Sequence, residues 1–177
     1  MVDEATPSRR ERQREATSDE IKQVARQQMA EEGTAGLSLR GIARQMGLSA
    51  PALYRYYPSR DELITALIVD AFHALGDATQ AAQVHMHTSD YAGRFLAMTV
   101  GYRQWALDHP VDFALIYGNP IPGYHAPAEV TTPAVRRSTA PLVNLLNESW
   151  LAGAMAPLDR AISPTVEAHL AGWAQQA

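Results

Sequence analysis

Residues 38–60 hold the side chains whose types and spacing point most directly to a chemistry. The run SLRGIARQMGLSAPALYRYYPSR contains four arginines and no acid. Its pattern predicts two short helices joined by a tight turn at Gly47, because glycine adopts a positive φ at the lowest cost. Such a pair suits the major groove of DNA, with one helix against the bases and its flanks on phosphates. The four arginines are Arg40, Arg44, Arg55 and Arg60.

The elements that must position these arginines are predicted to be helices. Thr17 and Glu20 have the spacing of a capping box and open a first helix, which Gly33 ends. Ser38 caps the second helix, Ser49 caps the third, and Ser59 with Glu62 forms a capping box that opens the helix after it. We therefore expect a three-helix unit in which the third helix follows the turn. Leu53 and Tyr57 are predicted to lie in the core.

The rest of the chain also shows helical spacing of apolar residues. No segment alternates with a period of two for long enough to indicate a strand, so the predicted fold class is all-α. The proline- and glycine-rich segment is predicted to be a loop. The expected helices are 59–84, 90–109, a short one from Pro110, one from Thr132–Pro133 to about Trp150, and 163–177, with the loop at 118–133.

Composition excludes several classes of protein. The hydrophobic content of 46% is that of a folded chain, and no run of 18 apolar residues predicts a membrane span. The charged start of the chain, SRRERQRE, does not resemble a secretory signal. With no cysteine there are no disulfides or thiolate sites. We expect a cytoplasmic protein.

Charge is divided unevenly along the chain. Residues 1–60 carry ten arginines and lysines against eight acids, whereas residues 61–177 carry five against eleven. A basic head on an acidic body suits a DNA-binding unit attached to a part that does not touch DNA.

The segment that combines these helices with the exit YRYYPSRDEL resembles the tetracycline-repressor (TetR) family of bacterial transcription regulators. The resemblance covers residues 17–63 and includes Gly33, the caps, the turn glycine and the apolar spacing. It implies a flexible basic arm (1–16), a helix-turn-helix domain (17–60) and a helical regulatory domain for ligand binding and dimerisation (61–177). It further implies a homodimer on near-palindromic double-stranded operator DNA, released by a small-molecule effector, with no cofactor.

The resemblance assigns the DNA contacts. Arg55 suits a bidentate bond to guanine, and the phosphate-binding side chains would fix the register of the protein on DNA. Where many family members have lysine this chain has Ala50, which removes one polar contact. The predicted DNA-binding residues are Ser38, Arg40, Ser49, Ala50, Pro51, Ala52, Tyr54, Arg55, Tyr56 and Arg60. The arginines of the arm have two interpretations, contacts in the minor groove or a disordered solubilising tail.

The second part resembles a regulator's ligand-binding body, with YRQWALDHPVDFALIYGNPIPGY (102–124) as its most recognisable run. An apolar pocket of roughly 300–1,000 Å³ is expected there. Its predicted lining is Phe95, Met98, Thr99, Tyr102, Trp105, Phe113, Tyr117, Leu146 and Trp150. Aromatic stripes at helical spacing also form ordinary core, so that interpretation stays open for each of them.

Other functions find little support in the residues. No nucleophile, base and orienting group stand out together, so no enzyme is predicted. His85 and His87 lack a nearby carboxylate cluster, so no metal site is predicted. A DNA-binding protein without a working pocket, constitutive or controlled by partners, remains the alternative.

Only one helix is expected after Trp150, where the family has two, so either the body is short or a last dimerisation helix lies outside this chain.

Overall fold

The computed structural model describes residues 8–119, 121–155 and 163–174, and within them every regular element is a helix. The all-α prediction is therefore confirmed. The described residues divide after Leu145 into two compact units, each considered by itself. The elements are α1 (Arg9–Glu32), the 3-10 helix η1 (Thr34–Gly36), α2 (Leu39–Gln45), α3 (Ala50–Tyr54), α4 (Arg60–Ala82), α5 (Tyr91–Asp108), α6 (Pro110–Tyr117), α7 (Ala128–Leu151) and α8 (Pro164–Ala174).

Helix α1 begins earlier than predicted. The start at Thr17 is wrong, since residues 9–16 are helical and Thr17 donates its hydroxyl to the Gln13 carbonyl within the helix. Ser8 and Glu11 form the capping box instead, each accepting a hydrogen bond from the backbone N–H of the other. Arginine, glutamate, glutamine and alanine are good helix formers, so the helix extends back to the first available cap. Residues 1–7 of the expected arm lie outside the described residues.

The larger hydrophobic cluster of the first unit spans the expected domain boundary. Ile21, Ile42, Leu53 and Leu63 are fully buried, and the same cluster of contacts extends to Leu115 on α6. The core therefore continues across the boundary expected at residue 60. The division into a DNA-binding and a regulatory domain stays a prediction about function.

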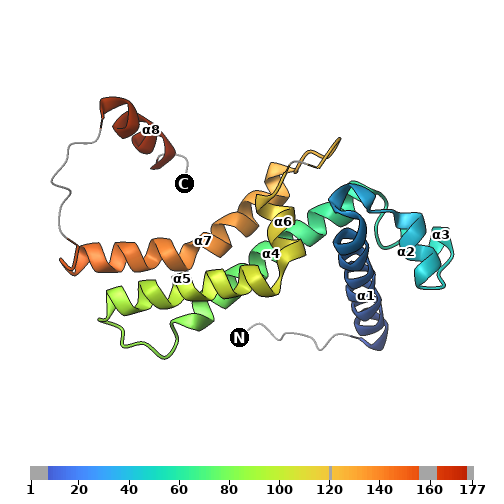
Figure 1. Cartoon of the computed structure of the whole chain (residues 1–177), viewed down its shortest axis with the longest axis horizontal. Helices are drawn as coiled ribbons and strands as arrows, with labels where there is room; N and C mark the ends of the chain where they lie inside the picture. Colours follow the sequence, from blue (N-terminus) through green and yellow to red (C-terminus); the bar gives the residue numbers. More distant parts are fainter. Residues whose placement is uncertain (1–7, 120, 156–162, 175–177) are drawn as a thin grey trace. The chain divides into compact units, whose positions relative to one another are not determined.

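Helix α4 connects the two ends of this unit. In Figure 1 it leads from the group formed by α1, α2 and α3 and runs alongside α5. Ser59 caps it by accepting a hydrogen bond from the Glu62 backbone N–H, as predicted. Near its far end α4 crosses α7 so closely that a Cβ on Gly76 would lie 2.9 Å from the Cα of Ser138. Glycine is required there because any larger residue would force the helices apart.

Helix α7 begins before the predicted position. Residues 128–133 were expected in a loop, but they are helical, and Pro133 and Pro141 both lie within the helix. The Val130 and Thr131 backbone N–H groups donate to the Pro127 carbonyl at 3.0 Å, which starts the first turn. Each internal proline removes only one backbone hydrogen bond, and the other bonds of a 24-residue helix maintain it.

The second unit contains α8, which begins after Ser163 as predicted. The Ser163 hydroxyl accepts a hydrogen bond from the Val166 backbone N–H at 3.3 Å and caps the helix. Residues 175–177 of the predicted last helix lie outside the described residues.

Candidate DNA-binding surface and ligand pocket

The turn between α2 and α3 is built by caps and one glycine. The Ser38 hydroxyl accepts from the Gly41 N–H at 3.2 Å, and the Ser49 hydroxyl accepts from the Ala52 N–H at 3.3 Å. Between the helices Gly47 has φ 66°, a conformation that side chains disfavour. The two short helices are therefore held in a fixed angle by local hydrogen bonds.

Helix α3 presents a small outer face. It has five residues, and the fully buried Leu53 anchors it in the core. Pro51, Tyr54 and Arg55 are exposed, while the two alanines are half-buried. Because the exposed face has no bulky side chain at its start, its backbone can approach a DNA groove closely.

Four of the ten predicted DNA-binding residues gather in one place. A hollow of about 470 Å³, here called the α2–α3 hollow, lies where α2, α3 and α4 begin or end. Its lining includes Ser38, Arg40, Tyr54 and Arg60. Together with Tyr56, these are the residues that the family resemblance places on phosphates, so a phosphate group in the hollow would meet several of them at once.

Arg60 has an internal role that sequence reasoning missed. Its Nε donates to the Leu37 carbonyl at 3.2 Å, and its Nη2 donates to the Thr34 and Ala35 carbonyls at 3.0 and 3.5 Å. These bonds fasten the start of α4 to the loop before α2. Sequence offers no signal for them, because backbone carbonyls are present at every position.

Arg55 and Tyr56 face a second hollow, on the other side of α3. This α1–α3 cleft has a volume of about 910 Å³. It is lined by Arg9, Arg10, Glu11, Gln13 and Arg14 of α1 together with Arg55 and Tyr56. The predicted DNA-binding residues thus fall on two adjoining surfaces, with Ser49, Ala50, Pro51 and Ala52 on the first turn of α3.

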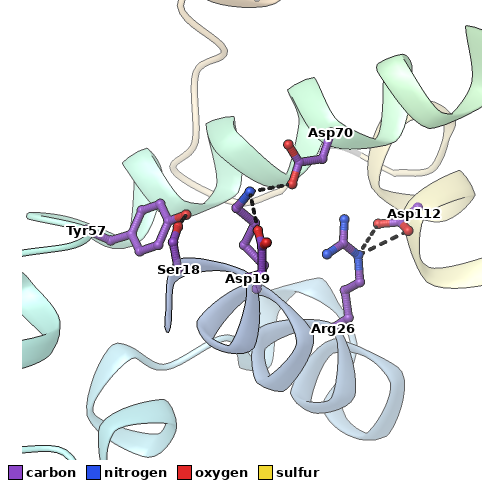
Figure 2. Close-up of polar contacts among 7 residues, drawn as sticks. Ser18, Asp19, Arg26, Tyr57, Asp70 and Asp112 are labelled. Carbon is purple, nitrogen blue, oxygen red and sulfur yellow. Dashed lines mark hydrogen bonds and ion pairs between the residues drawn. The ribbon is translucent and has the colours of Figure 1, made fainter. Parts of the chain in front are cut away.

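Polar contacts fasten α1 to the residues after α3 and to α4. The Ser18 and Tyr57 hydroxyls lie 2.8 Å apart (Figure 2). One turn further along α1, Lys22 Nζ lies 2.8 Å from Asp70 Oδ2 on α4 and 3.4 Å from Asp19 Oδ1. Burial lowers the pKa of Lys22, but its contacts with Asp70 and Asp19 outweigh burial and raise that pKa overall.

A second ion pair joins α1 to α6. Arg26 Nε donates to both carboxylate oxygens of Asp112, at 2.8 and 3.1 Å (Figure 2). Asp112 is buried, with 7% of its surface exposed, and it lies 86 residues away along the chain. Sequence reasoning missed this pair, since Asp112 had the ordinary place of an acid in a first helical turn.

A cavity lies between α4, α5, α6 and α7, in the region where the sequence predicted a ligand pocket. Its volume is about 280 Å³, just under the expected range. Five of the nine predicted residues line it: Phe95, Met98, Thr99, Tyr102 and Tyr117. Leu75, Thr79, Ser138, Thr139 and Leu142 complete the wall. The lining contains no acidic or basic side chain. Burial, and then the neighbouring Tyr102, raise the pKa of the Tyr117 phenol.

The other four predicted pocket residues lie elsewhere. Trp105 is buried in core against α4 and stacks on His109 with ring centres 5.2 Å apart. The ring of Phe113 packs edge-on against that of Tyr102, with 6.3 Å between the ring centres, and so contacts a residue of the pocket wall without lining the pocket itself. Leu146 and Trp150 do not line the pocket and are 40% and 57% exposed. The core interpretation therefore holds for Trp105 and Phe113.

Neither a metal-binding cluster nor a membrane-spanning helix occurs in the described part of the chain. His87 Nδ1 lies 2.8 Å from the Ser89 hydroxyl, and no group of three or more metal-ligating side chains occurs in residues 8–119, 121–155 and 163–174. Within those same ranges no helix has both the length and the apolarity needed to cross a bilayer.

Comparison with known proteins identifies relatives over most of the chain. The HTH-type transcriptional regulator Rv1816 of Mycobacterium tuberculosis is 41% identical over 124 residues, which are 70% of this chain and 53% of that protein. This chain thus spans about half the length of the curated relatives it matches. The crystal structure of the candidate regulatory protein SCO4313 superposes with TM-score 0.73 and 38% identity, covering 94% of this chain and 72% of that one. A protein of unknown function from Rhodococcus sp. RHA1 gives TM-score 0.69 and 28% identity, with coverages of 90% and 76%.

Two family descriptions match, one at each end of the chain. Residues 21–67 match the bacterial regulatory proteins of the tetR family, and residues 95–177 match the tetracyclin repressor-like C-terminal domain. The first match covers the helix-turn-helix, and the second covers most of the pocket wall. With its all-α fold and both matches, the chain belongs to the tetR family of bacterial regulatory proteins, which are DNA-binding transcription regulators and not enzymes.

Proposed function

We propose that this protein binds a near-palindromic operator as a homodimer and represses transcription until a small, largely apolar molecule releases it. Residues 17–60 would contact DNA, and residues 61–177 would bind the effector and form the dimer. The observation that carries the proposal is the exposed face of α3, flanked by the α2–α3 hollow with its converging arginines and hydroxyls. Two such faces would enter successive major grooves about 34–36 Å apart.

The pocket supports an uncharged effector. Its threonine and serine hydroxyls already donate to backbone carbonyls within their own helices: Thr79 to Gly76, Thr99 to Phe95, and Ser138 and Thr139 to Val135. Their oxygens keep lone pairs, so they present acceptors to a ligand. A small apolar molecule with one hydrogen-bond donor therefore fits the chemistry, whereas an ion would find no partner of opposite charge.

Release requires the pocket to influence the DNA-binding helices. Tyr117 at the end of α6 lines the pocket, and Asp112 in the first turn of α6 holds Arg26 of α1. Helix α4 likewise carries Leu75, which lies in the pocket wall, and Asp70, which forms an ion pair with Lys22 of α1. A ligand that fits one arrangement of α4 and α6 better than another would shift the position of α1 by its difference in affinity.

Selection of binding sites from random duplex DNA tests the DNA contacts. Wild-type protein should select a two-fold motif, and Arg55→Ala should cost about 1–3 kcal/mol while relaxing one base position per half-site. The same motif from both proteins would contradict the role of Arg55. Arg103→Ala, an exposed arginine on α5, is the matched control and should select the wild-type motif.

Repression and release are tested on the selected operator. A reporter placed behind that operator should be repressed, and a screen of small uncharged compounds should yield one that restores expression. Thr99→Trp fills the pocket, so it should repress normally but no longer respond. If no compound restores expression with the wild-type protein, and Thr99→Trp represses the reporter as the wild type does, the result supports the alternative of a DNA-binding protein without a functional ligand pocket.

A further inference from the structure

We propose that the first two turns of α1 form a second DNA-backbone contact, in which Arg10 and Arg14 bind phosphates beside the site that α3 occupies. The inference rests on the proposed binding of DNA. It adds a binding element outside the helix-turn-helix and assigns a ligand class, duplex DNA phosphates, to the α1–α3 cleft.

The extension is held as a helix. Ser8 and Glu11 cap it reciprocally, and no glycine or proline interrupts α1 between Arg9 and Glu32. Its packed part begins at the hydrogen bond of Ser18 with Tyr57 and the fully buried Ile21. At 1.5 Å per residue, Arg10 lies about 12 Å beyond Ser18 along the helix axis. The extension therefore projects from a fixed base and does not fold back on the core.

Helical register directs two arginines toward α3. Arg14 and Arg10 precede Ser18 by four and eight residues, and residues spaced by four share one face of a helix. Ser18 contacts Tyr57, three residues after the end of α3, so this face of α1 is turned toward the segment that leaves α3. The lining of the α1–α3 cleft agrees, since it brings Arg10 and Arg14 together with Arg55 and Tyr56.

The charge of the cleft calls for an anion. Four arginines and one glutamate line it, and Glu11 is the residue engaged by the Ser8 cap. Within the described part of the chain no hydrogen bond or ion pair joins the guanidinium groups of Arg9, Arg10, Arg14 and Arg55 to another group, so these charges repel one another, and Glu11 compensates for only part of that repulsion. A backbone with one negative charge per about 1.7 Å of duplex supplies that compensation at several points.

The position of the cleft selects DNA as the occupant. Arg55 and Tyr56 line the cleft and also follow directly on α3, the helix proposed to enter the major groove. A duplex seated on α3 would continue past these two residues along its own backbone. The arginines of α1 would then meet phosphates that flank the bases contacted by α3, which positions the protein without specifying sequence.

The experiment uses the full chain and a fluorescent 30-base-pair duplex of mixed sequence, with affinity measured by anisotropy between 50 and 200 mM salt. The logarithm of the binding constant falls with the logarithm of salt concentration by about 0.9 per phosphate contact. Arg10→Ala/Arg14→Ala should reduce that slope by about two and weaken binding at low salt. Alanine is a good helix former, so circular dichroism should show the helix retained.

Two controls separate contact from net charge. Arg103→Glu on α5 changes the net charge by the same amount, and its slope should match that of wild-type protein. Arg10→Lys/Arg14→Lys keeps both charges and should restore the slope. An unchanged slope for the double alanine variant, or an equal loss for Arg103→Glu, would overturn the inference.

A last variant tests the helix itself. Ala16→Pro leaves every arginine in place but breaks the ladder between the extension and the packed part of α1. It should lose slope as the double alanine variant does; a wild-type slope would show that a flexible arm suffices and would overturn the helical contact. If wild-type protein itself fails to bind the duplex, the proposed function fails, an outcome distinct from any of these.

Discussion

The ion pair between Arg26 and Asp112 should stabilise the fold far more than an exposed pair of the same chemistry. It joins α1 to α6, and the Asp112 side chain is 10% exposed. Asp112→Asn keeps the shape of the side chain and removes its charge, which strands the guanidinium of Arg26. The change therefore tests the contact and leaves packing nearly intact.

The expected magnitude follows from burial. Removing one partner of a fully buried pair costs about 3–5 kcal/mol, and a hydrogen bond to a charged group contributes about 1.5–3 kcal/mol. The Arg26 side chain is 27% exposed, so water can partly solvate the stranded charge. We therefore expect Asp112→Asn to lower the free energy of unfolding by about 2 kcal/mol, below the fully buried range.

A pair of double-mutant cycles measures this by urea denaturation followed by circular dichroism. The first cycle uses Arg26→Met and Asp112→Asn. The second uses Arg137→Met and Asp77→Asn, a matched pair with a separation of 2.7 Å but with side chains 49% and 67% exposed. The coupling energy of the buried pair, Arg26–Asp112, should be about 2 kcal/mol, and that of the exposed pair, Arg137–Asp77, should be below about 1 kcal/mol. Equal coupling energies would refute the argument from burial.

Three further predictions concern packing, pH and the pocket. Gly76→Ala should lower the free energy of unfolding by about 1–3 kcal/mol, because the new Cβ would meet the backbone of Ser138. Gly172→Ala on α8 has open space around it and should be neutral or stabilising. Equal melting temperatures for the two variants would contradict the close crossing of α4 and α7. The pKa of Lys22 is raised in the folded state, so its contribution to stability is fully present below the unfolded pKa of about 10.4 and is lost as pH rises through the higher folded pKa. The difference in unfolding free energy between wild type and Lys22→Met should therefore shrink from pH 9 to pH 11. A constant difference would argue against a raised pKa. Thr99→Trp should keep the melting temperature within about 2 °C, because Thr99 borders open space; a loss equivalent to about 1–3 kcal/mol would show a filled core instead.

Local signals in the sequence predicted the elements well where caps and apolar spacing agree. The turn at Gly47, the caps at Ser38, Ser49 and Ser59, and the buried Leu53 all depend on residues within a few positions of each other. Physical rules for caps and glycine apply at that range without knowledge of the fold. These features therefore emerged from the sequence alone.

Sequence reasoning failed where two local signals competed. Thr17–Glu20 and Ser8–Glu11 both have the spacing of a capping box, and the pattern by itself does not say which one opens the helix. Pro133 was expected in the first turn of a helix that follows a loop, but the helix already starts after Pro127 and contains Pro133 in its interior. In both cases the helix starts at the earlier of the two possible positions, because each residue added after the costly first turn forms one more backbone hydrogen bond.

Contacts between distant segments were beyond prediction. The sequence predicted a pocket on the helix of Phe95 and Tyr102, and a cavity lies beside that helix, but Ser138 and Thr139 enter its wall through the crossing at Gly76, which depends on the tertiary fold. Trp105 has the same helical spacing as its neighbours and turns into the core instead. Periodicity identifies an apolar face but not which part of that face borders empty space.

The two sites are joined through α6 by geometry that leaves little freedom. Asp112 and Tyr117 are five residues apart on a helix of eight, about 7.5 Å along its axis, so a short helix of this kind moves as one body. A ligand that displaces Tyr117 by about 1 Å would displace Asp112 too, which exceeds what hydrogen bonds of 2.8 and 3.1 Å to Arg26 tolerate. Either α1 follows α6, carrying the cleft beside α3 with it, or the ion pair breaks. In both cases a bound effector would change DNA binding by at most the free energy with which it prefers the displaced arrangement, and the stability of the Arg26–Asp112 pair would set how large that preference must be.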